Sequence, residues 1–282
     1  MKRLAFILLA ASAPAMGGPV QTSPSLGADN YRVDVPMAAP AGTPRFADEF
    51  DAPAIDTTRW RYDTARNKAG WYNNERQYYA ADRPENARIE RGTLVIEARA
   101  ERLRDRADWG GQAYSSAKLV TRQPLGYGFY EIRAQLPCGR GIWPAIWLLP
   151  PDGKWPDAGE IDVMEMVGSN PGVVLGTVHS GAFNHVKGTQ RGAETTLPRA
   201  CDSMHRYQLE WTPDTITIGI DGGGYMRVRN DRPGGQAAWP FTRPYDLILN
   251  VAVGGDWAGA RGIDDTAFPQ AMRVDYVRYW AR

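Results

Sequence analysis

The sequence predicts an all-β protein, built as a sandwich of two curved antiparallel sheets. Short segments of alternating apolar and polar residues recur along the chain, separated by Gly and Pro. No window of eleven or more residues keeps the 3.6-residue apolar period of a helix. A large sandwich of this kind leaves one concave polar face, on which a polymer could lie.

The clearest strand pattern covers residues 128–136. Apolar residues such as Ile132 share one face there, and Glu131 and Arg133 share the other. We expect the face of Glu131 and Arg133 to be the concave one. The other expected strands cover residues 93–98, 118–121, 215–220, 246–254 and 272–280.

The first residues have the pattern of a secretory signal peptide over 1–15. Lys2 and Arg3 precede an apolar run that is too short to span a bilayer, and Ala13 to Ala15 forms a small-residue cleavage site. Residues 16–44 are rich in Pro, Ala and Gly, so we expect a linker or flexible tail. One domain over 45–282 follows, and we expect a secreted protein, periplasmic or extracellular.

Composition limits the partners. The chain has 33 basic and 32 acidic residues, a balance that points to neither nucleic acid nor an anionic membrane. Its 13 Tyr and 10 Trp residues exceed what an ordinary core needs and suit a surface that stacks on flat ligands, although many must fill the core. We expect a monomer.

The chain has two cysteines, Cys138 and Cys201, each beside a turn-like segment. In an oxidising compartment they can pair. We expect a disulfide; the alternative is two separate thiols.

The most unusual stretch is residues 160–165, which hold three carboxylates among apolar residues. On a strand, Glu160 and Asp162 point the same way, whereas Glu165 points to the opposite face. A one-residue bulge at Val163–Met164 would bring Glu165 back to the first face. The cluster is then a candidate acid/base site; the alternatives are an exposed acidic strand edge and a metal site.

Five segments together resemble the family 16 glycoside hydrolases, in particular the bacterial laminarinase-like endo-β-1,3-glucanases. They cover residues 72–79, 141–150, 155–165, 250–257 and 268–277. The resemblance implies a concanavalin A-like β-jelly-roll with a concave substrate cleft. It also implies a retaining mechanism that needs no cofactor for its chemistry.

The resemblance assigns Glu160 as the nucleophile and Glu165 as the general acid/base. A retaining glycosidase needs two carboxyl groups about 5–5.5 Å apart across the anomeric carbon. Asp162 lies between them, and we expect its charge to hold Glu165 protonated.

The resemblance also suggests which residues contact sugar. His179 would form hydrogen bonds in the cleft; the alternative is a structural histidine. Trp155 and Trp147 are the favoured stacking platforms, followed by Trp257, while Trp143 is expected to be half in the core. The polar contacts are expected from Asn74, Glu131, Arg133 and Asn250, and the alternative for each is a solvated strand face. Trp211 and Trp280 are expected to pack in the core.

A structural calcium ion is a further implication. Glu49, Asp275 and the carbonyl of Gly92 match the family's positions on the convex side, and oxygen ligands of this kind suit calcium. The alternative is a surface acid pair.

The leading hypothesis is a secreted endo-acting enzyme that cuts β-1,3-glucan or mixed β-1,3-1,4-glucan. Small Ala252, two residues beyond Asn250, favours the β-1,3-glucanase branch. The alternatives are the same fold acting on a galactan or a β-1,4-linked glucan, a non-catalytic glucan-binding protein, and a metal-dependent nuclease. Residues 181–188 fit none of the family patterns.

Overall fold

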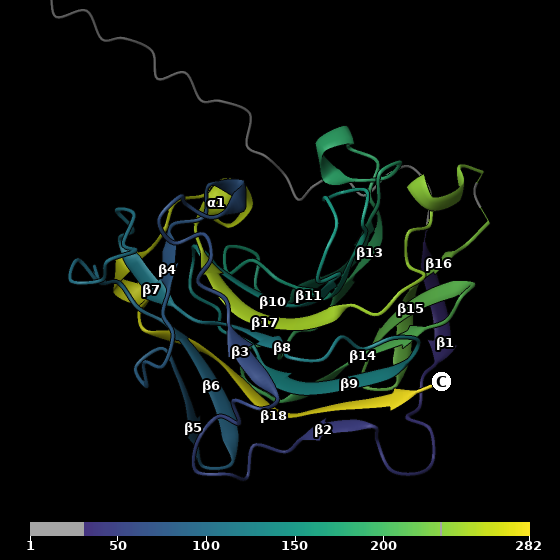
Figure 1. The fold of residues 1–282 in the computed structure, drawn as a ribbon, viewed down its shortest axis with the longest axis horizontal. Coiled ribbons are helices and arrows are strands. Elements are labelled where there is room, and N and C mark those ends of the chain that lie inside the picture. Colours follow the sequence, from purple (N-terminus) through teal and green to yellow (C-terminus); the bar gives the residue numbers. More distant parts are fainter. Residues whose placement is uncertain (1–30, 232) are drawn as a thin grey trace, which may run out of the picture.

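The computed structural model describes residues 31–231 and 233–282. Two antiparallel sheets lie one above the other, as the sequence predicts, and loops rise around the open face of the upper sheet (Figure 1). The predicted signal peptide lies outside the described residues, as does the part of the predicted tail that precedes residue 31.

The upper sheet has seven strands and carries the candidate site. In spatial order these are β13 (Arg191–Thr196), β12 (Val173–His179), β11 (Glu160–Glu165), β10 (Ile142–Leu149), β17 (Asp246–Val253), β8 (Lys118–Thr121) and β3 (Trp60–Tyr62). We call this the inner sheet.

The lower, outer sheet has nine strands. Their order is β1 (Arg32–Pro36), β16 (Gly223–Arg229), β15 (Thr215–Ile220), β14 (His205–Trp211), β9 (Gly128–Gln135), β18 (Gln270–Ala281), β6 (Thr93–Ala98) and β5 (Ala87–Glu90), with β2 (Phe46–Asp48) also paired to β18.

The remaining elements are short. β4 (Gln77–Tyr79) and β7 (Tyr114–Ser116) form a parallel pair. The helical turns are η1 (Tyr72–Asn74), η2 (His185–Lys187), η3 (Gly235–Ala237), α1 (Gly255–Ala258) and η4 (Asp265–Ala267). None of the described helices is long and apolar enough to cross a membrane.

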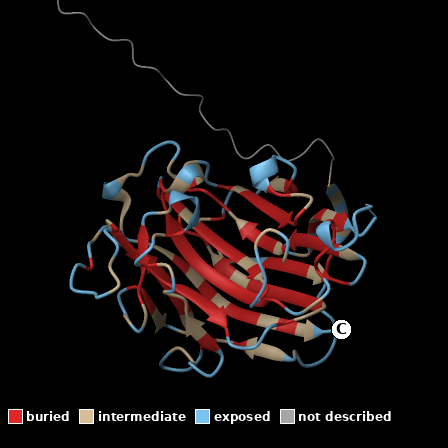
Figure 2. Ribbon diagram, turned by 45° about the horizontal axis from the view of Figure 1, so that its top comes forward, coloured by how far each residue is buried: buried red, intermediate tan, exposed pale blue. Residues whose placement is uncertain are grey.

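Strand alternation builds the core between the sheets, where buried residues predominate (Figure 2). On β17, Leu247, Leu249 and Val251 have no exposed surface and point into the core. The alternate residues Asn250 and Ala252 therefore line the opposite, open face, as their parity predicts. Trp211 is fully buried as expected, whereas Trp280 is only partly buried and its indole donates to Gly42 O.

Part of the predicted tail is a strand. Residues 32–36 form β1 and pair with β16 at the edge of the outer sheet. Val33 and Val35 are half-buried, while Arg32, Asp34 and Pro36 are exposed. The expected boundary at residue 45 is therefore too late, because Pro and Ala around this segment hide a short alternating edge strand.

The predicted placement of Glu131 and Arg133 in the concave cleft is wrong. Both residues lie on β9, which belongs to the outer sheet between β14 and β18. Glu131 accepts hydrogen bonds from Gln208 and Tyr276, and Arg133 pairs with Asp275. The alternation itself is as predicted, but the polar face of β9 turns to the convex side.

The predicted disulfide is confirmed. Cys138 and Cys201 are bonded, and their Cα atoms lie 5.8 Å apart, a separation usual for a disulfide. The bond ties the turn after β9 to the turn before β14.

The geometry does not support the predicted calcium site. Glu49 binds Arg278 through both carboxylate oxygens, and Asp275 binds Arg133. A calcium ion would have to displace both arginines, so the set does not fit an open oxygen cage.

Candidate active site

The bulge predicted in the acidic stretch is present. Ile146 on β10 pairs with Met164 on β11, and the next residue, Trp147, pairs with Asp162. Val163 therefore has no partner on β10 and is the extra residue of the bulge. The register with β12 shifts over the same part of β11. Because of this extra residue, the third carboxylate returns to the face of the first two.

Two neighbours contact the carboxylates directly. Trp143 Nε1 donates to Glu165 Oε1 at 3.1 Å, so Trp143 faces the cleft more than predicted. His179, opposite Glu160 on β12, places Nε2 3.2 Å from Asp162 Oδ2. That oxygen has no hydrogen-bond partner among the described residues, so the two side chains are neighbours without a hydrogen bond between them. Asp162 is 2% and His179 6% exposed, so both are parts of the cleft floor.

The three carboxyl groups raise one another's pKa. Burial, and then the charge of Asp162, raises the pKa of Glu160 to about 8. Burial also raises the pKa of Glu165 to about 7; His179 opposes this shift, and the charge of Glu160 adds to it. Burial and the charge of Glu165 raise the pKa of Asp162 well above its ordinary value. The cluster therefore retains at least one proton at neutral pH. The acids whose charges add to the rise in the pKa of Glu165 are Glu160 and Glu75, where Asp162 was expected.

A hydrogen-bonded chain holds Trp147 on the cleft floor. Its indole donates to Asn250 Oδ1 at 2.7 Å, and Asn250 Nδ2 donates to the hydroxyl of Tyr79 at 2.9 Å. Asn250 thus lies on the predicted face, but its amide is already bonded to protein on both sides. The indole faces of Trp147 and of Trp71 lie 4.9 Å from Lys118 Nζ.

The other predicted tryptophans lie outside the strands, Trp257 on a short helix and Trp155 in a loop. Trp257, on α1, meets Trp143 edge to face with ring centres 5.1 Å apart. Trp155 is partly buried in the loop before β11, and its ring centre lies 6.1 Å from that of His179. The site therefore has indole surfaces on both sides of the carboxylates.

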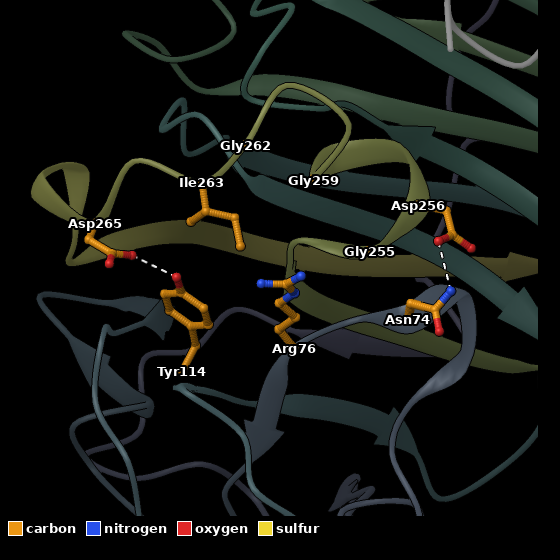
Figure 3. Close-up of a pocket in the computed structure, with 9 residues that line it drawn as sticks. All are labelled: Asn74, Arg76, Tyr114, Gly255, Asp256, Gly259, Gly262, Ile263 and Asp265. Carbon is orange, nitrogen blue, oxygen red and sulfur yellow. Dashed lines mark hydrogen bonds between the residues drawn. The ribbon is translucent and has the colours of Figure 1, made fainter. Parts of the chain in front are cut away.

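Asn74 has a different environment. Its amide donates to Asp256 on α1, and both residues line a cavity of about 290 Å³ into which Arg76 points (Figure 3). Tyr114 donates to Asp265 at the far wall. No residue of β11 is among those that line this cavity.

The sequence interpretation missed three residues of the site. Lys118 lies on β8 opposite Asn250 and pairs with Asp63 at 2.9 Å; its parity on the predicted strand was the available signal. Glu75 lies in the loop already singled out, and its charge adds to the rise in the pKa of Glu165. His185 lies in the segment without a pattern, so no sequence signal pointed to it.

The same cluster also meets the spacing of a metal site. Carboxylate oxygens of Glu160 and Asp162 and a ring nitrogen of His179 lie within 4.8 Å of one another. It is the only such group in the described part of the chain. The bulge and the flanking indoles nevertheless match a carbohydrate cleft better, because metal binding requires neither.

Two glutamates on either side of an aspartate, on the floor of a curved sheet with indole surfaces nearby, define a glycoside hydrolase of the two-carboxylate class. The sequence model of glycosyl hydrolases family 16 matches residues 74–278. The chain belongs to this family, and the resemblance drawn from the motifs is confirmed.

Individual relatives agree. A β-glucanase of Rhodothermus marinus is 48% identical over 247 residues, which cover 83% of this chain and 84% of that protein. The crystal structure of SCLam, a non-specific endo-β-1,3(4)-glucanase of the same family, is 52% identical and has a TM-score of 0.88, covering 93% of this chain and all of that one. A Glu-to-Ser variant of SCLam, with 52% identity, a TM-score of 0.87 and coverage of 90% and 100%, holds 1,3-β-D-cellobiosyl-glucose at its active site.

Proposed function

We propose that this protein is a secreted, retaining endo-β-1,3(4)-glucanase. The observation that carries the proposal is the bulged strand β11, which gathers three carboxylates on one face of the inner sheet. Family membership and the similarity to an endo-β-1,3(4)-glucanase over nearly the whole chain support the substrate class. The oligosaccharide in the relative's active site shows that such a cleft accommodates a mixed-linkage glucan.

In the first step, the Glu160 carboxylate attacks the anomeric carbon and forms a glycosyl ester. Glu165 donates its proton to the glycosidic oxygen as that bond breaks. In the second step, Glu165 takes a proton from water, whose oxygen attacks the same carbon and releases Glu160. Two inversions leave the anomeric configuration unchanged.

The neighbours of the cluster support these roles. The indole of Trp143 orients the Glu165 oxygen that it touches, so this carboxyl group can face the leaving group. Asp162 and His179 lie beside Glu160 on the floor of the cleft. The ionised Glu160 carboxylate supplies the negative charge near the reacting carbon, where positive charge develops in the transition state.

The tryptophans supply the binding surface. Trp155 and Trp147 are the proposed platforms for glucosyl rings, whose apolar faces stack on indole. Lys118 and the Asn250–Tyr79 pair fix the plane of Trp147. A polysaccharide chain can extend over several such positions, which suits internal cleavage.

Secretion is part of the proposal. It rests on the signal-peptide pattern of residues 1–15 and on the Cys138–Cys201 disulfide, which suits an oxidising compartment. The expected export product lacks the leader. Mass spectrometry of protein recovered from the periplasm or medium checks this directly.

A single assay tests the activity. Laminarin, lichenan, curdlan, agarose and xyloglucan are incubated in parallel with the protein, and released reducing sugar is measured. We expect release from laminarin and lichenan, with oligosaccharides of several lengths appearing early. Release only from agarose or xyloglucan would overturn the substrate class, and no release with retained laminarin binding would favour a glucan-binding protein.

Azide rescue tests the roles of the two glutamates. With an activated aryl β-glycoside, Glu160→Ala should form the α-glycosyl azide, because azide replaces the missing nucleophile. Glu165→Ala should form the β-glycosyl azide, because azide attacks the glycosyl ester in place of water. The opposite pattern would exchange the two roles.

A further inference from the structure

The loop between β12 and β13, residues 180–190, leans on the loop that carries Trp155. Gly181 approaches Asp157 so closely that a Cβ atom on it would lie 2.5 Å from the aspartate oxygen. Next to Gly181, Ala182 N donates to the carbonyl oxygen of Ala237, the last residue of η3. The loop thus closes the cleft rim on the side of Trp155.

His185 is the residue of this loop that reaches the site. Its ring centre lies 5.0 Å from that of Trp155 with the planes inclined by 34°, and 5.2 Å from that of His179 in an edge-on arrangement. His179 in turn contacts Asp162. A continuous row of side chains therefore leads from the loop to the carboxylates.

The loop holds His185 firmly in place. The buried side chain of Asn184 donates to the carbonyls of Ser180 and Gly181 and accepts from the backbone N–H of Lys187. The ammonium group of Lys187 donates to Gly181 O as well. These bonds fix η2 as a small rigid unit, so His185 has little freedom to leave the indole.

The imidazole is suited to packing. Burial, together with the positive charge of His179 when protonated, lowers the pKa of His185 to about 4. His185 as a whole residue is exposed, so its ring is only partly covered by its contacts. A ring with this pKa is neutral near pH 7, so it packs against the indole as an uncharged group. Neighbouring Val186 is exposed and has no comparable contact.

We propose that His185 is a positioning residue that holds Trp155 at the angle needed to stack on a glucosyl ring beside Glu160. This inference rests on the proposed function, in which Trp155 is a sugar platform. His185 touches the indole rather than the sugar, so its effect is transmitted through Trp155. Residues 181–188, which fit none of the sequence patterns of the family, then become a determinant of glucan affinity.

A double-mutant cycle with laminarin tests this inference. We expect His185→Ala to raise KM about two- to tenfold, the range that an aromatic contact contributes, with a smaller effect on kcat. His185→Phe, which keeps a neutral ring, should restore most of the affinity. Val186→Ala, the matched control on the same turn, should leave both constants unchanged.

The diagnostic result is non-additivity. In a Trp155→Ala background, His185→Ala should cause no further rise in KM. Additive effects would overturn positioning in favour of a direct sugar contact, and an equal loss of kcat and melting temperature without change in KM would indicate a purely structural role. If Trp155→Ala alone left KM unchanged, the proposed platform would fail; if only His185→Ala had no effect, this inference alone would fail.

Discussion

Two strands of this sandwich carry acidic residues, β9 with one and β11 with three, yet only β11 gathers its acids into one cluster. Glu131 on β9 is 5% exposed and its carboxylate is bonded by donors from Gln208 and Tyr276. The acids of β11 are crowded by one another, and burial with mutual repulsion raises their pKa. A buried acid surrounded by donors stabilises the fold, whereas one surrounded by acids retains protons for chemistry.

The largest expected effect contrasts these two acids directly. Glu160→Gln removes the proposed nucleophile, so kcat on laminarin should fall about a thousandfold or more. Glu131→Gln should change kcat less than twofold, because β9 lies in the other sheet. Its new amide donors face Gln208 and Tyr276, so the free energy of unfolding should drop by about 1–3 kcal/mol.

Steady-state kinetics and chemical denaturation of both variants measure this contrast. Circular dichroism confirms that Glu160→Gln is folded. Near-normal turnover by Glu160→Gln, or a large kinetic loss in folded Glu131→Gln, would show that the two acids do not differ as described.

A smaller effect is expected where an indole touches the acid. Trp143→Phe keeps a ring but removes the donor to Glu165, and kcat should fall about tenfold, as for the loss of one hydrogen bond to a charged group. That hydrogen bond lowers the pKa of Glu165, so its loss should move the alkaline limb of the pH–rate profile to higher pH.

Trp280→Phe provides the outer-sheet control, because its indole donates to the carbonyl of Gly42. The pH–rate profile of this variant should match that of the unmodified protein. If the alkaline limb of the pH–rate profile were unchanged in Trp143→Phe, Trp143 would have no influence on the pKa of Glu165.

Crowding of the acids also predicts how stability varies with pH. The pKa of Glu160 is raised from 4.5 to about 8 on folding, so the folded state binds this proton more tightly. The resulting stability is complete below pH 4.5 and is lost as pH rises through about 8. Glu160→Gln cannot ionise at this position, so it avoids the loss of folding stability at high pH. At pH 9 its melting temperature should exceed that of the unmodified protein by about 2–4 °C for each kcal/mol by which the free energy of unfolding increases.

Calorimetry at pH 4 and pH 9 checks the sign. The difference in melting temperature should be small at pH 4, where the carboxyl group is protonated in both states. If the difference in melting temperature between the two proteins were equal at both pH values, or larger at pH 4, the pKa of Glu160 would not be raised by folding.

The smallest effect is expected from Arg133→Ala on β9. Its ion pair with Asp275 is partly exposed, so the free energy of unfolding should change by less than about 1 kcal/mol. KM for laminarin should stay within twofold. Lys118→Met on the inner sheet is the positive control, for which KM should rise. A rise of more than twofold in KM for Arg133→Ala would show that Arg133 contacts substrate in the cleft.

Much of the site was predictable because its constraints are local. The five-residue step from Glu160 to Glu165 requires a bulge if both acids share a face, and the bulge is present. The parity of Asn250 on residues 246–254 was also sufficient to place it on the open face. The early boundary of the folded chain was missed because β1 is short and has Pro at its end.

Alternation could not reveal which sheet β9 joins. It identifies the residues that share a face, but both sheets of a sandwich have the same period of two. Glu131 and Arg133 were therefore grouped correctly with each other and assigned to the wrong surface. Loops have no period, so His185 gave no signal before its contact with Trp155 was seen.

The sequence by itself determined the class of fold, the bulge in the acidic strand and the pair of cysteines, because strand period, residue spacing and residue type are written locally in the chain. Only the tertiary structure decided which residues far apart in the sequence meet. Trp147 and Asn250 are 103 positions apart, and Asn74 and Asp256 are 182 apart. Such contacts depend on the order of strands in each sheet, a global property that no local pattern specifies.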